Sequence, residues 1–254
     1  TGAGNIAVGK DSLDSNTTGS NNTALGLDAL QNNSTTSDNT AVGMNALFIS
    51  TGCRNVAVGS CSLKANTTGT HNVASGFASL LVNTEGCKNV ASGYSALGSN
   101  TTGDENVAIG CGALVLNTTA DSNTAVGSQA LKANTTAAGN TAVGKSSLTA
   151  NTTGASNTAV GKESLLANTT ANDNTALGFR AMCKTTTGCQ NAAVGTNVMR
   201  QNTTGDLNVA IGYRALDANT TADNNTAVGA DSLLSNTTGA NSVAVGCGAL
   251  TDNT

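Results

Sequence analysis

The chain has 254 residues, with 30 Gly, no Pro, no Trp, three Phe, two Tyr, one His and only 10% charged residues. Its apolar residues are largely Ala, Val and Leu, which argues against a large enzyme fold with an aromatic core. The net charge of −4 and the scattered aromatic residues exclude the basic stripe and the stacking platform that nucleic-acid binding needs, so we expect no nucleic-acid partner.

An Asn-x-Ala-x-Gly motif recurs throughout the chain. Its copies begin at Asn5, Asn22, Asn39, Asn55 and so on to Asn225, and Ser242 opens the fifteenth copy. The spacing is 17 residues, except for the 16 residues from Asn39 to Asn55. This regularity excludes a disordered linker. We interpret residues 1–254 as a single repeat array, and we expect it to be a segment of a longer fibre protein.

The consensus is Asn-Thr/Val-Ala-Val-Gly-x-x-Ala/Ser-Leu-x-x-Asn-Thr-Thr-Gly-x-x, and positions below are counted from the opening Asn. A strict repeat of this length predicts one coil of a solenoid, because one unit is too small to bury its apolar face alone. Helical repeats need roughly 30 residues or more. The sequence therefore predicts an all-β fold, a parallel β-solenoid (β-roll) of fifteen 17-residue coils.

The elements expected within each coil follow from its residue types. Positions 2–4 are predicted to form a short strand, which the Gly at position 5 ends. Positions 8 and 9 are predicted to form a second short strand, and Asn-Thr-Thr-Gly a turn. We expect both faces of the first strand to be buried, and positions 6, 7, 10, 11, 16 and 17 to face solvent. The structural positions 3, 5 and 9 are represented by Ala7, Gly9, Leu13, Ala108, Gly110, Leu114, Ala244, Gly246 and Leu250.

The many asparagines have a structural interpretation. In stacked coils like residues lie above one another, at about the 4.8 Å spacing of neighbouring strands. The Asn side chains of positions 1 and 12 would then form ladders, with amides bonding from coil to coil.

The repeat resembles those of two groups of surface proteins. Ser242-Val243-Ala244-Val245-Gly246, and Asn106-Val107-Ala108-Ile109-Gly110 followed by Ala113, resemble the head repeats of YadA-like trimeric autotransporter adhesins. The whole repeat is also similar to arrays in tail-fibre proteins of phages and aquatic viruses. The resemblance implies a left-handed parallel β-roll with three chains around one axis, at the surface of a cell or virion.

The seven cysteines lie outside the apolar positions. No C-x-x-C pair is present and His71 is the only imidazole, so we expect no metal site. Structural disulfides and free thiols both remain open. Cys183 and Cys189 flank one turn and are the best candidates for a disulfide.

Two further alternatives concern the Asn-Thr-Thr turn. Each copy matches an N-glycosylation acceptor, so it is either a turn alone or a glycan site as well. Stacked Thr at positions 13 and 14 also allow an ice-binding face. The candidate glycosylation sites are Asn16, Asn66, Asn100, Asn117, Asn134, Asn151, Asn168, Asn202, Asn219 and Asn236.

We therefore expect a rigid, non-catalytic component of an extracellular or virion fibre, assembled as a homo-oligomer, most simply a trimer. No convergent catalytic groups and no cofactor motif are found. The alternative is a surface-binding adhesin that contacts host glycans, and ice binding is a lesser one. No apolar run is long enough to span a membrane, and the first residues lack the pattern of a signal peptide.

Overall fold

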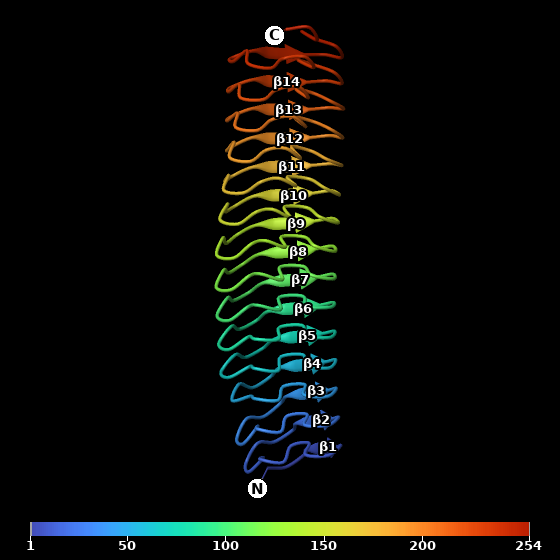
Figure 1. Cartoon of the computed structure of the whole chain (residues 1–254), viewed down its shortest axis with the longest axis vertical. Helices are drawn as coiled ribbons and strands as arrows, with labels where there is room; N and C mark the ends of the chain where they lie inside the picture. Colours follow the sequence, from blue (N-terminus) through green and yellow to red (C-terminus); the bar gives the residue numbers. More distant parts are fainter. Residues whose placement is uncertain (1, 254) are drawn as a thin grey trace. The chain divides into compact units, whose positions relative to one another are not determined.

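The computed structural model describes residues 2–253. It divides into two compact units, unit 1 ending at Asn123 and unit 2 beginning at Thr124. Within each unit the chain winds as a parallel β-solenoid with one short strand in every coil, and the strands stack in chain order (Figure 1). The all-β solenoid fold and its 17-residue spacing are thus confirmed. That the whole repeat forms a single array stays a prediction.

Each strand covers positions 2–4 of its coil. In unit 1 the strands are β1 (Ile6–Val8), β2 (Thr23–Leu25), β3 (Thr40–Val42), β4 (Val56–Val58), β5 (Val73–Ser75), β6 (Val90–Ser92) and β7 (Val107–Ile109). In unit 2 they are β8 (Thr124–Val126), β9 (Thr141–Val143), β10 (Thr158–Val160), β11 (Thr175–Leu177), β12 (Ala192–Val194), β13 (Val209–Ile211), β14 (Thr226–Val228) and β15 (Val243–Val245). Neighbours within a unit pair in register, so that Ala74 lies opposite Ala91 in unit 1 and Ala159 opposite Ala176 in unit 2.

The interior of each coil is thin. The position-3 Ala is buried in every strand from β2 to β15, and only the Ala7 of the first coil is exposed. The position-9 side chain fills the rest of the apolar interior: Leu114 is fully buried, whereas Leu250 of the last coil is 52% exposed. A methyl group on the strand leaves space for the Leu, so the alternation of small and large apolar residues fixes how the coil closes.

Position 5 requires glycine for two reasons. The φ angles there lie in a region that side chains disfavour, such as 134° at Gly93. A Cβ atom on Gly93 would also lie 2.7 Å from the carbonyl carbon of Gly110 in the next coil. Consecutive coils thus approach at backbone contact distance, which explains why this glycine never varies.

The prediction of a second strand at positions 8 and 9 is wrong. The φ angles of positions 7 and 9 are positive, 51° at Ser95 and 50° at Leu97, so the backbone cannot be extended there. The segment is a turn whose N–H groups still bond axially: Ser95 donates to the Phe77 carbonyl of the preceding coil, and Leu97 to the Ala113 carbonyl of the next. These axial bonds offset the cost of a positive φ at a leucine.

The prediction that both strand faces are buried is also wrong for the single chain. Positions 2 and 4 are half-buried or exposed in all fifteen strands. Only the Ala face turns inward, because side chains alternate along a strand. Each unit therefore carries an outward face of Val, Ile, Leu and Thr, which we call the strand face.

Candidate functional surfaces

Two asparagine ladders hold the coils together, as predicted. Asn72 at position 1 accepts the backbone N–H of Asn89 in the next coil and donates its amide to the carbonyl of Gly86. Asn83 at position 12 donates to the same carbonyl and to the Oδ1 of Asn66 in the preceding coil, at 2.9 Å each. All four side chains are fully buried. Since a buried amide is costly unless bonded, the ladders fix the register of the stack.

One coil of unit 2 interrupts the position-12 ladder. Thr185 replaces the asparagine and is fully buried, and its Oγ1 has no hydrogen-bond partner. The Oδ1 of Asn168, one coil earlier, is also unpaired. The reason is chemical, because a threonine has no amide to donate toward Asn168. Ser50 makes the corresponding substitution in unit 1 without this defect, since its Oγ donates to the Gly52 carbonyl.

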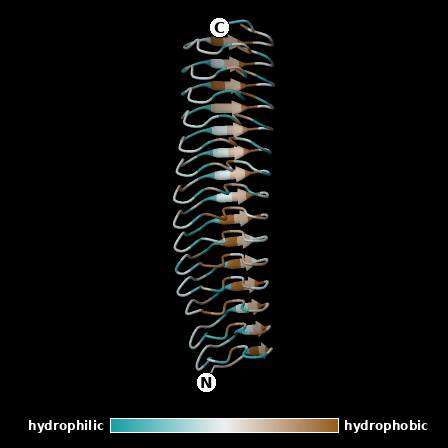
Figure 2. Ribbon diagram, in the orientation of Figure 1, coloured by the Kyte–Doolittle hydropathy of each residue, from teal (hydrophilic) through white to brown (hydrophobic). Residues whose placement is uncertain are grey.

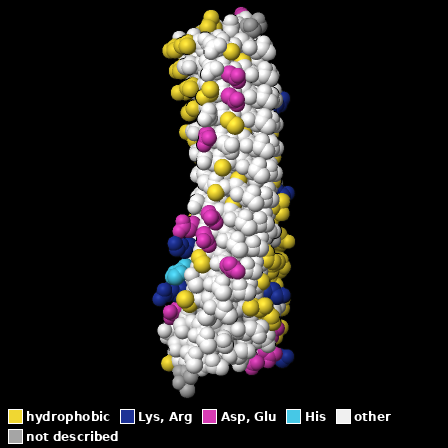
Figure 3. Space-filling view, turned by 90° about the vertical axis from the view of Figure 1, so that its left-hand side faces the viewer, with side chains coloured by type: hydrophobic (Ala, Val, Ile, Leu, Met, Phe, Trp, Pro, Cys, Tyr) yellow, Lys and Arg dark blue, Asp and Glu magenta, His cyan; other side chains and the backbone are white. Residues whose placement is uncertain are grey.

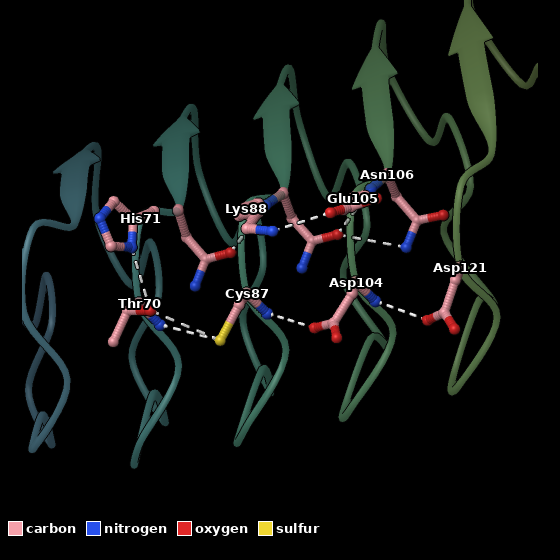
Figure 4. Close-up of polar contacts among 10 residues, drawn as sticks. Thr70, His71, Cys87, Lys88, Asp104, Glu105, Asn106 and Asp121 are labelled. Atoms are coloured by element: carbon pink, nitrogen blue, oxygen red, sulfur yellow. Dashed lines mark hydrogen bonds and ion pairs between the residues drawn. The ribbon is translucent and has the colours of Figure 1, made fainter.

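A third ladder runs along position 16, one of the corner positions expected to face solvent. In unit 1 the N–H of Cys87 donates to Asp104 at 2.6 Å, and the N–H of Asp104 donates to Asp121 at 2.7 Å (Figure 4). The N–H of Thr70 is 3.4 Å from the Cys87 sulfur. The sequence carried a signal that could have been used: Ser, Thr, Cys, Asn and Asp, all hydrogen-bond acceptors, dominate this position.

Unit 2 repeats this arrangement. The N–H of Asn172 meets the Cys189 sulfur at 3.3 Å, and the N–H of Cys189 donates to Asp206 at 2.6 Å. The N–H of Asp206 donates to Asp223 at 2.7 Å. The same Cys-Asp-Asp order therefore serves the same axial bonding in both units.

The predicted disulfide between Cys183 and Cys189 is not formed. All seven cysteines are free thiols. The sulfur of Cys183 instead contacts the next coil, 3.8 Å from the Arg200 carbonyl oxygen. The thiol of Cys189 donates within its own coil, to the Thr187 carbonyl at 3.3 Å. Burial raises the pKa of the Cys183 thiol, although Arg180 and Arg200 act in the opposite direction.

The candidate glycosylation asparagines are the position-12 ladder itself. Asn66, Asn100 and the later ones to Asn236 are fully buried, and Asn16 in the first coil is half-buried. The amide of Asn100, for example, donates to Asn83 and Gly103. A glycan on this nitrogen is incompatible with the packing of a folded coil, so the structure favours the turn interpretation.

The threonine files do not form two rows of free hydroxyls. At position 13 the Oγ1 of Thr84 donates to the Thr101 carbonyl at 3.0 Å, and that of Thr152 donates to the Thr169 carbonyl at 3.0 Å. These side chains are half-buried, whereas position 14 is exposed, as at Thr153. Only one file is therefore free to contact water, which weakens the ice-binding alternative.

The strand face is the most regular apolar surface of each unit. Val58 and Ile109 in unit 1, and Val160 and Ile211 in unit 2, are 38% to 44% exposed. The strands are drawn in brown or pale colours, while teal residues occur mainly in the loops (Figure 2). On the face drawn in Figure 3, most atoms are neutral, and charged side chains occur in small separate groups.

Some charged side chains form axial pairs at the corners, and others pair within one coil, as Lys10 does with Asp11. The Nζ of Lys88 lies 2.9 Å from Glu105, and this hydrogen bond lowers the pKa of Glu105 and raises that of Lys88. His71 is exposed, with its Nδ1 3.1 Å from the Thr70 hydroxyl. Within residues 2–253, no group of three His, Cys, Asp or Glu side chains is placed to hold a metal ion. Nor does this part of the chain contain a helix long and apolar enough to cross a membrane.

Compared with models of known protein families and with curated proteins, the chain matches none.

Proposed function

We propose that this chain is a rigid, non-catalytic segment of an extracellular or virion fibre. The observation that supports this role most directly is the set of three axial ladders, two of buried asparagines and one of more exposed side chains at position 16, which join neighbouring coils. Side chains at positions 1, 12 and 16 act on neighbouring coils instead of converging on a pocket. This arrangement resists extension and suits a spacer, whereas catalysis needs titratable groups gathered around a substrate.

Self-association is part of the proposal. The strand face presents a Val, Leu or Ile at position 4 of thirteen of the fifteen strands, and a regular apolar surface of this kind favours association. Three chains with their strand faces turned toward a common axis would bury it. Burial of the Val, Ile and Leu side chains, at roughly 25 cal/mol per Å², supplies the driving force.

Light scattering after size-exclusion chromatography tests the assembly. The parent protein is expected at three times the 24.8 kDa mass of one chain. The double variant Ile109→Glu with Ile211→Glu should elute at the mass of one chain, because each trimer would then bury six carboxylates. The matched control, Thr68→Glu with Thr153→Glu, changes exposed position-14 residues and should keep the parent mass. A parent protein with the mass of one chain contradicts the assembly.

Immunogold electron microscopy of the intact source tests the fibre role separately. Antibodies against the chain should label filaments that project from a cell or virion surface. Label confined to the interior would contradict this role.

A second candidate role is contact with glycans, and one observation in unit 1 favours it. Phe77 and Tyr94 at position 6 stack with centroids 5.6 Å apart, and both are more than half exposed. The strands of the same two coils end in Ser75 and Ser92 instead of branched apolar residues. Exposed rings beside hydroxyl groups suit the apolar faces and polar edges of sugars. If the role is correct, Tyr94→Ala should abolish signals on a glycan array, whereas Met44→Ala, at position 6 of an earlier coil, should not.

A further inference from the structure

A hollow of about 400 Å³ lies on one corner of unit 2. Positions 7, 10 and 11 of three consecutive coils line it. The polar and charged residues of its wall are Glu163, Arg180, Cys183, Lys184, Arg200 and Gln201. Its volume falls within the range of small-molecule sites.

The hollow is richer in cations than in carboxylates. The Glu163 carboxylate pairs with two cations: it accepts a hydrogen bond from the Nε of Arg180 at 2.6 Å and lies 3.5 Å from the Nζ of Lys162. Lys184 bonds only to a neutral group, the Oε1 of Gln201, at 2.6 Å. Among the ion pairs of residues 2–253, none involves Lys184.

Arg200, on the far wall, pairs with a carboxylate that lies outside the lining of the hollow. Asp217 is nearly buried and accepts two hydrogen bonds from Arg200, at 3.1 Å each. The Nε of Arg214 lies 3.8 Å from the same carboxylate, and its Nη1 lies 3.7 Å from Asp231. The lining of the hollow itself therefore holds three cations, Arg180, Lys184 and Arg200, and one carboxylate, Glu163, although the chain as a whole carries a net charge of −4.

The fixed geometry of these cations matters as much as their number. The bidentate bond to Asp217 orients the Arg200 guanidinium, and the bond to Glu163 orients that of Arg180. Guanidinium groups held in place bind planar or tetrahedral oxyanions with little further loss of entropy. The half-buried Cys183 lines the same hollow.

We propose that this hollow binds an acidic saccharide, whose carboxylate or sulfate group lies against Arg180, Lys184 and Arg200. A nucleic acid fits less well. The nearby Phe179 ring is already approached by Lys162, at 5.7 Å, and by Arg180, at 5.1 Å, so it is not free to stack on a base. The proposal does not depend on the fibre role or on the aromatic pair of unit 1.

Calorimetric titration of the full chain at low salt tests the proposal. The probes are trigalacturonate for a carboxylate ligand, sucrose octasulfate for a sulfated one, and neutral maltotriose. At least one charged probe should bind and maltotriose should not, and added salt should weaken binding. The stronger charged probe identifies the anionic group.

Two substitutions with opposite expected effects make the test specific. Lys184→Gln should weaken binding about fivefold, the size of one exposed ion contact. Glu163→Gln should strengthen it about threefold, because it releases Arg180 from a competing carboxylate. The matched controls, Lys132→Gln at an exposed position 10 and Glu85→Gln in unit 1, make the same changes in net charge away from the hollow.

Several outcomes would overturn the proposal. These are equal effects of Lys184→Gln and Lys132→Gln, no gain with Glu163→Gln, binding of neither charged probe, or binding of maltotriose as tight as that of the charged probes. Tighter binding of the oligonucleotide dT6 than of either acidic saccharide would assign the hollow to nucleic acid instead.

Discussion

Each buried asparagine bonds both along the stack and within its own coil, because one amide can donate and accept at once. Asn100 illustrates the bonding: its Nδ2 reaches Asn83 and Gly103, and its Oδ1 accepts from Asn117 in the next coil. A threonine can supply only a hydroxyl of shorter reach. This difference explains why Thr185 leaves two polar atoms of the ladder unpaired.

Thr185→Asn is therefore expected to stabilise unit 2. Its new amide can donate to Asn168, and its oxygen can accept from Asn202, so the free energy of unfolding should rise by about 1 to 2 kcal/mol. Urea denaturation followed by hydrogen exchange of unit 2 amides measures the change. Thr187→Asn, at an exposed position 14, is the control and should have almost no effect. A loss of stability with Thr185→Asn would contradict the ladder.

The cysteines should differ in reactivity at pH 8. Cys111 and Cys247 are exposed, whereas Cys183 is half-buried with a raised pKa, so less of it is thiolate. We expect iodoacetamide to modify Cys183 on the order of tenfold more slowly than Cys111. Mass spectrometry of peptides sampled over time measures both rates. Equal rates, or a Cys183–Cys189 disulfide in the unreduced map, would count against the structure.

At the scale of the coil, the glycines at positions 5 and 15 differ in how strictly the structure requires them. Gly93 at position 5 has a φ of 134°, and a Cβ there would collide with the backbone of the next coil. Gly86 at position 15 is also close to its neighbours, with Gly103 O at 2.5 Å from a Cβ. Yet other coils carry alanine at position 15, as at Ala120 and Ala171, so small shifts accommodate a methyl group there.

Gly93→Ala should accordingly destabilise unit 1 by about 3 kcal/mol or more, through backbone strain and steric overlap. Gly86→Ala is the matched control and should change the free energy of unfolding by less than about 1 kcal/mol. Thermal and urea unfolding of the two variants measure the difference. Similar losses in both would mean that the corner at position 5 is not formed as described.

The sequence predicted the coil, its strand, its glycine corner and two of its ladders, because these depend on invariant residue types at a fixed spacing. It did not predict the turn at positions 8 and 9, since leucine in the left-handed region is rare and only axial hydrogen bonds such as that of Leu97 make it favourable. The position-16 ladder was missed because its acceptors vary in identity. The hollow was missed because its residues come from three coils.

At the scale of the whole molecule, residues that vary between coils determine which surface is available for contacts. The strand face recurs in both units and supports self-association, whereas the aromatic pair belongs to unit 1 and the cationic hollow to unit 2. A repeat with an invariant Ala and Gly, and with Leu or Met at position 9, can thus vary its corner residues without disturbing the interior. Binding sites on such a scaffold depend on which corner residues adjacent coils bring together.

Spin-label distances within unit 2 test most directly whether like residues stack along an axis. With the native cysteines of the chain replaced by serine, labels at exposed position 14 are placed four coils apart, at Thr153 and Thr221, and six coils apart, at Thr136 and Thr238. At about 4.8 Å per coil, electron paramagnetic resonance should give separations of about 19 Å and 29 Å between the labels, because labels at like positions share the same orientation along the stack. Distances that do not grow in proportion to the number of coils would contradict the stacked solenoid.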